Sequence, residues 1–187
     1  MDEKRKSFRR QYFLEDDELA IGIIGRLVPV KNHEMFLKVI QNVMARTTKK
    51  VRAFIVGDGE ELQNLFAMCN EMKIDFTYAP TEKRKASLTF TSWMRDAERA
   101  MAGFDILTLT SLNEGTPVSR TEAKAEQKPI VSTNVGGIEN VVLKNQTAFL
   151  SESNDINGFS DRLLSLIENE SERNKMIQKS RQNVENK

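Results

Sequence analysis

Two carboxylates, Glu114 and Glu122, stand eight residues apart and are the side chains of this sequence best placed for chemistry. The apolar run 106–110 before them has the length of a buried strand. Thr116-Pro117 then predicts the start of a helix, with the threonine as N-cap and the proline at the first helical position. Glu114 therefore lies in the loop, while Glu122 lies on a helical stripe otherwise fit for packing, where a charge needs a partner or a ligand.

The first turn of that helix provides a second kind of binding group. Its backbone N–H groups, from about Val118 to Arg120, have no partners inside the helix, and the helix dipole is positive at this end. Together they form a seat for an anion such as a phosphate. Carboxylates that accept hydrogen bonds from hydroxyls, on either side of a phosphate seat, indicate a sugar nucleotide as the ligand.

A pair of cations follows the first predicted strand, at 20–25. Gly25 ends this strand and lets the backbone approach a ligand. Arg26 and Lys31, five residues apart, could clamp a diphosphate from one side. Taken alone, two cations on a loop are more simply explained as solvated surface charge.

Two more turns follow predicted strands. Gly57-Asp58-Gly59 comes after the strand 51–56, and a tight turn explains it, because G-x-G alone is weak evidence for NAD. Thr91-Ser92-Trp93 is interpreted as a loop after a short strand. For Trp93, geometry alone favours packing in the core or at a pocket rim over a base-stacking platform.

Glu114-x7-Glu122, within the segment SLNEGTPVSRTEA, resembles the E-x7-E signature of retaining group 1 (family 4) glycosyltransferases. Those enzymes have the two-domain GT-B fold. The segments GRLVPVK at 25–31 and FTSWMRD at 90–96 resemble further motifs of that family, in the same order. The resemblance covers about 20–150, which is most of the chain.

The resemblance implies a role for each matching residue. Glu114 would reach the donor sugar, and Glu122 would bind the ribose hydroxyls. Arg26 and Lys31 would stabilise the departing nucleoside diphosphate, so the implied catalytic residues are Arg26, Lys31 and Glu114. The other implied donor-binding residues are Gly25, Thr91, Ser92, Gly115, Thr116 and Val118. The implied mechanism needs no metal and no cofactor beyond the nucleotide-diphosphate sugar, which is the donor substrate.

Apolar segments of strand length alternate with helical ones, which predicts a parallel sheet covered on both faces. The predicted strands span 20–25, 51–56, 88–90, 106–110, 129–133 and 147–150. The predicted helices span 32–46, 60–73, 95–102, 138–143, 155–167 and 171–186, besides the one that starts at Pro117. The polar groups follow the carboxyl ends of strands, where open α/β sheets bind ligands.

We therefore expect a three-layer (α/β/α), Rossmann-like, doubly wound domain over 19–187, which the resemblance identifies as one half of a GT-B enzyme. Residues 1–18 are expected to be a short amphipathic helix or a solvated linker. In either case they would lead in from an absent N-terminal, acceptor-binding domain.

Composition excludes several function classes. The 28 basic and 27 acidic residues nearly cancel, so the net charge does not favour nucleic acid, and the basic run 83–85 is expected to be a solvated loop. Cys69 and His33 are the only residues of their types, which excludes a disulfide framework and a histidine-based zinc site. We expect Cys69 to be buried and inert. We expect His33 in the first turn of a helix, exposed or hydrogen-bonded locally.

No apolar run approaches the ~18 residues of a transmembrane helix, and no signal peptide is evident. We expect a cytoplasmic protein, with peripheral attachment to the inner membrane through the missing domain as an alternative.

The sequence thus predicts the donor-binding domain of a retaining hexosyltransferase that uses a nucleotide-diphosphate sugar, with UDP expected over GDP. The whole enzyme would transfer the sugar to an acceptor that the sequence does not identify, and the isolated domain is expected to be inactive. Two alternatives stay open. One is another nucleotide-sugar enzyme, such as a UDP-N-acetylglucosamine 2-epimerase, and the other is a noncatalytic α/β module that binds a protein.

Overall fold

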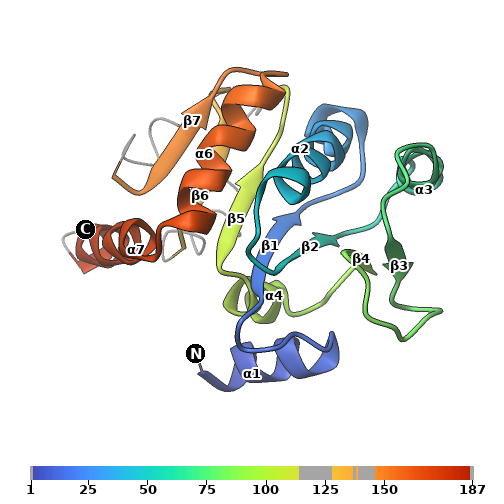
Figure 1. The fold of residues 1–187 in the computed structure, drawn as a ribbon, viewed down its shortest axis with the longest axis horizontal. Helices are drawn as coiled ribbons and strands as arrows, with labels where there is room; N and C mark the ends of the chain where they lie inside the picture. Colours follow the sequence, from blue (N-terminus) through green and yellow to red (C-terminus); the bar gives the residue numbers. More distant parts are fainter. Residues whose placement is uncertain (1, 114–127, 137, 139–145, 186–187) are drawn as a thin grey trace.

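The computed structural model describes residues 2–113, 128–136, 138 and 146–185. The strands within these residues are β1 (Leu19–Ile24), β2 (Val51–Val56), β3 (Phe76–Tyr78), β4 (Leu88–Ser92), β5 (Ile106–Leu109), β6 (Ile130–Thr133) and β7 (Ala148–Ser151). The helices are α1 (Asp2–Gln11), the 3₁₀ helix η1 (Pro29–Lys31), α2 (His33–Arg46), α3 (Leu62–Glu71), α4 (Ala97–Gly103), α6 (Ile156–Glu168) and α7 (Glu170–Glu185). All neighbouring strands pair in parallel, in the order β3-β4-β2-β1-β5-β6-β7. The predicted Rossmann-like parallel sheet is confirmed (Figure 1).

Helices cover both faces of the sheet, which gives the three predicted layers. Ile21 and Ile23 of β1 pack in one core with α2, α3 and α6. The alternating residues Ala20 and Ile24 belong to a second core, which includes α1 and α4. The strands are therefore apolar on both faces, as is usual when a parallel sheet is buried on both sides. Figure 1 shows α2 and α6 next to each other over the first face.

The strand order changes direction at β1. The chain first places β2, β4 and β3 on one side of β1, and then returns to place β5, β6 and β7 on the other side. Open α/β sheets bind ligands in the crevice outside the carboxyl ends of the strands at such a switch point. The loops after β1 and β5 border that crevice.

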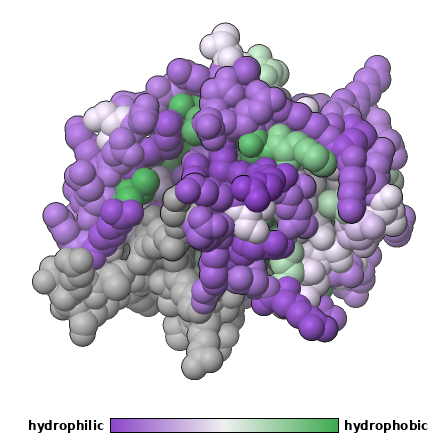
Figure 2. Space-filling view, turned by 90° about the horizontal axis from the view of Figure 1, so that it is seen from below, coloured by the Kyte–Doolittle hydropathy of each residue, from purple (hydrophilic) through white to green (hydrophobic). Residues whose placement is uncertain are grey.

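α1 packs against the sheet and α4 through a cluster of aromatic rings. Phe8 is fully buried, and its ring centroid lies 5.2 Å from that of Phe54 and 5.4 Å from that of Phe104. At the side of the cluster, Arg5 Nη2 lies 2.7 Å from Asp105 Oδ1. The residues before β1 thus begin with a docked helix. Figure 2 views the molecule from below, the side of α1, and shows a largely hydrophilic outer surface there.

The edge of the sheet departs from the sequence prediction. β3 is absent from the predicted strands, because three residues are too few for a clear apolar pattern. Arg84 Nη2 donates to the carbonyl oxygen of Phe76 at 2.5 Å, so a charged side chain blunts this edge. β4 continues to Ser92, which means that the prediction of a loop at Thr91-Ser92 is wrong.

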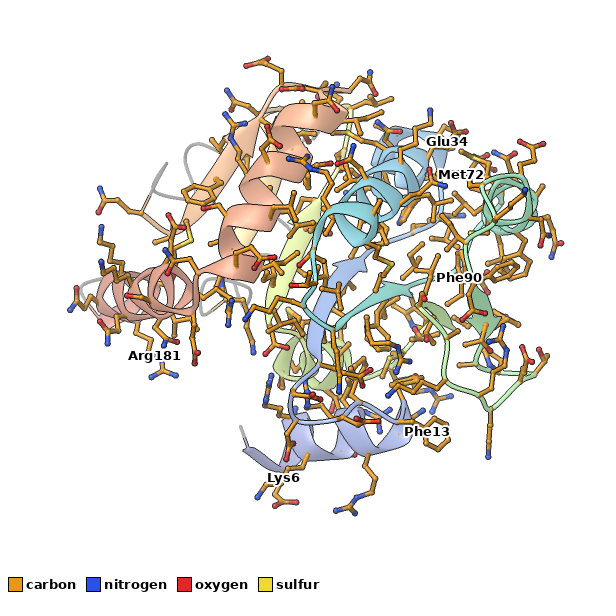
Figure 3. The ribbon with its side chains drawn as sticks, in the orientation of Figure 1. Lys6, Phe13, Glu34, Met72, Phe90 and Arg181 are labelled. Atoms are coloured by element: carbon orange, nitrogen blue, oxygen red, sulfur yellow. The ribbon has the colours of Figure 1, made fainter. Side chains whose placement is uncertain are left out.

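Aromatic rings also attach these edge strands to α3. Phe66 of α3 has its ring centroid 5.0 Å from that of Phe90 in β4 and 5.2 Å from that of Phe76 in β3. Figure 3 shows Phe90 directed into the space between the sheet and α3. The edge is therefore held by packing as well as by backbone pairing.

Replacing Phe8 by alanine should lower the free energy of unfolding by about 3–5 kcal/mol, because it opens a cavity in the cluster that holds α1. Phe13→Ala is the matched control. Phe13 is 51% exposed and points away from the protein beyond α1 (Figure 3), so its loss should cost less than about 1 kcal/mol. Urea unfolding gives the free energy of unfolding of both variants. Equal decreases in the two would show that Phe8 does not anchor α1.

Candidate functional site

A pocket of about 470 Å³ opens at the carboxyl ends of β1, β2, β4 and β5. This volume is in the range of sites for small molecules. Its charged members are Arg26 and Lys31, from the loop after β1, and Asp58, from the turn after β2. Its apolar members are Ile24, Val56, Met94, Ala97, Met101, Leu107 and Leu109, and all of these except Ala97 belong to or pack against the second core.

The turn after β2 presses directly against the loop after β1. A Cβ atom on Gly57 would lie 1.9 Å from the carbonyl oxygen of Gly25, and one on Gly59 would lie 2.3 Å from that of Leu27. Leu27 N–H donates to the Asp58 carbonyl oxygen at 3.0 Å across this contact. The two glycines therefore serve the close approach of two backbones, as the interpretation of a tight turn requires.

This contact fixes the backbone on both sides of Arg26. Gly25 N–H donates to the Val56 carbonyl oxygen and Leu27 N–H to the Asp58 carbonyl oxygen, both at 3.0 Å. The Arg26 side chain itself is exposed. Lys31 ends η1 and is half-buried, and its N–H donates to the Val28 carbonyl oxygen at 3.0 Å. The structure thus brings the two predicted cations to one pocket.

The end of β4 directs Trp93 outward. Ser92 has a φ of 63°, and the register between β2 and β4 shifts beside it. Trp93 is consequently 65% exposed while it lines the pocket, so the expectation of core packing is wrong and that of a rim position agrees with the structure. Thr91 is buried, and its hydroxyl donates to the Ser92 carbonyl oxygen at 2.9 Å. Ligand contacts of Thr91 and Ser92 stay a prediction.

The predicted acids and the helix-start amides lie outside the described residues. They are Glu114, Gly115, Thr116, Val118 and Glu122. Leu109 of β5 lines the pocket, and three residues further on Leu112 N–H donates to the Val30 carbonyl oxygen at 2.8 Å. The segment that leads toward Glu114 therefore runs beside the loop that carries Lys31.

Sequence reasoning does not single out the apolar wall of the pocket. Ala97 and Met101 are four residues apart, so they share one side of α4, and Met94 lies in the segment just before that helix. That spacing could have identified an inward face. It could not have shown that the face borders a pocket.

His33 corrects one prediction. It begins α2 as expected, but its side chain is only 3% exposed, and neither ring nitrogen has a hydrogen-bond partner among the described residues. Burial, and then the charge of Lys31, lower the pKa of His33 to about 4. The expectation of an exposed or locally hydrogen-bonded imidazole is therefore wrong.

Other titratable groups lie away from the pocket. Cys69 is fully buried, and burial raises the pKa of its thiol to about 12, so the prediction of a buried, inert cysteine is confirmed. The basic run 83–85 is exposed, as predicted for a solvated loop, and Arg84 Nη1 lies 2.9 Å from Asp75 Oδ1.

The described residues form neither a cluster suited to a metal ion nor a helix suited to span a membrane. No group of three or more His, Cys, Asp or Glu side chains there is arranged to hold a metal ion. None of the helices in the same part of the chain is long and apolar enough to cross a membrane.

Comparison with protein families gives a match over nearly the whole chain. The family model described as "Glycosyl transferases group 1" matches residues 4–183. One relative is the UDP-Gal:alpha-D-GlcNAc-diphosphoundecaprenol alpha-1,3-galactosyltransferase of Escherichia coli, which is 29% identical over 153 residues. That match covers 81% of this chain and 37% of the relative. The chain spans less than half the length of the curated relatives it matches.

Solved structures share the fold, and these structural neighbours are GT-B glycosyltransferases. Anabaena HepE in complex with UDP has a TM-score of 0.77 and 19% identity, over 96% of this chain and 47% of that one. The C-terminal domain of a group 1 family glycosyltransferase, LpcC from Francisella tularensis, has a TM-score of 0.74 and 18% identity. That match covers 96% of this chain and 91% of the solved domain.

The burial of His33 predicts a loss of stability on acidification. Its pKa is about 4 in the folded chain and about 6.5 when unfolded, so the unfolded state binds more protons between these values. The neutral imidazole therefore contributes fully to the free energy of unfolding above pH 6.5. This contribution, about 3 kcal/mol in total, is lost as the pH falls to 4.

Between pH 7 and pH 4.5, the free energy of unfolding measured with urea should therefore fall more for the wild type than for His33→Leu. Carboxylates titrate in both proteins, so the difference between them isolates the imidazole. Equal losses in the two proteins would contradict a buried, neutral His33.

Proposed function

We propose that this chain, which belongs to the group 1 glycosyltransferase family, is the donor-binding C-terminal domain of a retaining, family 4 hexosyltransferase. Its donor would be a UDP-sugar. The acceptor-binding half would lie in an N-terminal domain. The length of the curated relatives and the similarity to a solved C-terminal domain over most of its length support this division.

The observation that carries the proposal is the position of the two cations. Arg26 and Lys31 reach one pocket at the switch point of the sheet, where α/β folds bind nucleotides. Their backbones are fixed by contacts with neighbouring segments, so the positions from which both side chains extend are set before a ligand arrives. A diphosphate is the group that such a pair of cations fits best.

In the proposed reaction, the bond between the sugar C1 atom and the diphosphate oxygen breaks, and C1 forms a new bond to the acceptor oxygen with the same anomeric configuration. The proton of the acceptor hydroxyl passes to the departing diphosphate. The leaving diphosphate gains negative charge. Arg26 and Lys31 stabilise this charge beside an apolar wall, where electrostatic interactions are stronger than in water. The two cations and the amides of Gly115, Thr116 and Val118 take the role that a metal ion has in other transferases.

The two acids complete the proposed site. Glu114 orients the donor sugar, and Glu122 accepts hydrogen bonds from the ribose hydroxyls. Both residues follow β5, which lines the pocket through Leu107 and Leu109. The acids would therefore approach the ligand from the side of the switch point opposite to β2.

The base would lie against the apolar part of the pocket, with Trp93 and Met94 near the end of β4. The UDP-Gal in the name of the Escherichia coli relative and the UDP in the HepE structure support UDP over GDP as the nucleotide. Without its acceptor half, the chain would bind the donor nucleotide and transfer nothing. A cytoplasmic location stays a prediction from the sequence.

Titration with UDP tests the proposal directly, because Trp93 is the only tryptophan of the chain and lines the pocket. Its fluorescence should change saturably with UDP. Arg26→Ala, Lys31→Ala and Glu122→Ala should each weaken binding by about tenfold or more, since each removes a charge-assisted hydrogen bond to the nucleotide.

Lys83→Ala is the matched control for the cations. It removes a lysine from the exposed run 83–85, and UDP affinity should stay within about twofold of the wild type. Wild-type protein that binds neither UDP nor GDP would support a noncatalytic interaction module instead. Binding of GDP in preference to UDP would contradict the choice of base.

A further inference from the structure

Thr110, the residue after β5, ties the end of this strand to the loop that carries Lys31. Its side chain is fully buried, and its hydroxyl Oγ1 lies 3.0 Å from the carbonyl oxygen of Lys31 and 2.9 Å from that of Asn32. A hydroxyl has one proton to donate, so the two carbonyl oxygens share it. One side chain just after β5 thus holds two consecutive carbonyl groups of the loop that carries Lys31.

These two peptide groups lie where the loop turns. Asn32 separates η1 from α2 and has φ and ψ of 52° and 50°, a left-handed conformation that is uncommon for residues other than glycine. Its side chain accepts a hydrogen bond from Met35 N–H at 3.3 Å, which caps α2 on the far side of the turn. The Thr110 hydroxyl holds the carbonyl group of Lys31, just before the turn, and the Lys31 side chain lines the pocket.

Two further hydrogen bonds hold the same segments together. Leu112 N–H donates to the Val30 carbonyl oxygen at 2.8 Å, and the Thr133 hydroxyl donates to the Ser111 carbonyl oxygen at 2.7 Å. Residues 110–112 are therefore attached to the Lys31 loop on one side and to the end of β6 on the other. Movement of one of these segments would require movement of the others.

We propose that Thr110 is a positioning residue for donor binding, because its hydroxyl fixes the Lys31 and Asn32 carbonyls and so keeps the Lys31 cation in the pocket. This role rests on the proposed function.

Thr108 of β5, two residues before Thr110, provides a matched comparison. It is also fully buried, and its hydroxyl donates to the Gly22 carbonyl oxygen at 3.0 Å. Gly22 lies in the middle of β1, where pairing with β2 and β5 already fixes the backbone. Loss of the Thr108 hydroxyl should therefore reduce stability without moving a loop, whereas loss of the Thr110 hydroxyl should release one.

The test compares Thr110→Val, Thr110→Ser and Thr108→Val with the wild type by UDP titration and by hydrogen exchange of backbone amides. Thr110→Val should weaken UDP binding by about tenfold, and Thr110→Ser, which keeps the hydroxyl, should stay within about threefold. Thr108→Val should also stay within about threefold. If Thr110→Val does not fold, Thr110→Ala serves the same comparison.

Hydrogen exchange reports on the loop without any ligand. In Thr110→Val, the amides of Asn32 and Leu112, which donate to the Pro29 and Val30 carbonyls, should exchange about tenfold faster or more. The amide of Gly25, which donates to the end of β2, should change little and is the internal reference.

Three results would overturn the positioning role. They are UDP binding by Thr110→Val equal to the wild type, unchanged exchange at Asn32 and Leu112, and an equal loss of affinity in Thr108→Val. Each of these leaves the proposed function intact, provided that the wild type binds UDP. Failure of the wild type to bind either UDP or GDP would overturn the proposed function, and the role of Thr110 with it.

Discussion

The parallel direction of all the strands is the constraint on which the rest of this structure depends. Because every described strand runs the same way, every loop that follows a strand emerges at one edge of the sheet. The change of strand order at β1 then separates the loop after β1 from the loop after β5 and leaves a crevice between them. Residues far apart in the sequence, such as Arg26 and Trp93, can meet at one pocket for this reason.

Within that edge, backbone contacts determine how closely the loops approach. The glycines at 57 and 59 allow the turn after β2 to touch the loop after β1, since any side chain there would overlap a carbonyl oxygen. The contact holds the peptide groups on both sides of Arg26, while the end of β5 holds those of Lys31 and Asn32. The two cations are thus placed by different neighbours, one on each side of β1.

Several parts of this arrangement could be predicted from the sequence, because their signals are local. β2 has the predicted bounds, since VRAFIV is an apolar run interrupted only by Arg52, and the two loop cations lie within the GRLVPVK segment, which has a fixed spacing. The burial of His33 could not be predicted, because it depends on how the first turn of α2 packs beside the end of β5. The outward turn of Trp93 depends on the left-handed Ser92, which no residue type in that segment indicates.

A crystal structure of this chain with UDP would test the central claim most directly. The account predicts that the diphosphate contacts both Arg26 and Lys31 in the pocket at the carboxyl edge, with Glu122 at the ribose hydroxyls. UDP bound at the amino edge of the sheet, or bound at this pocket with its diphosphate directed away from both cations, would contradict it.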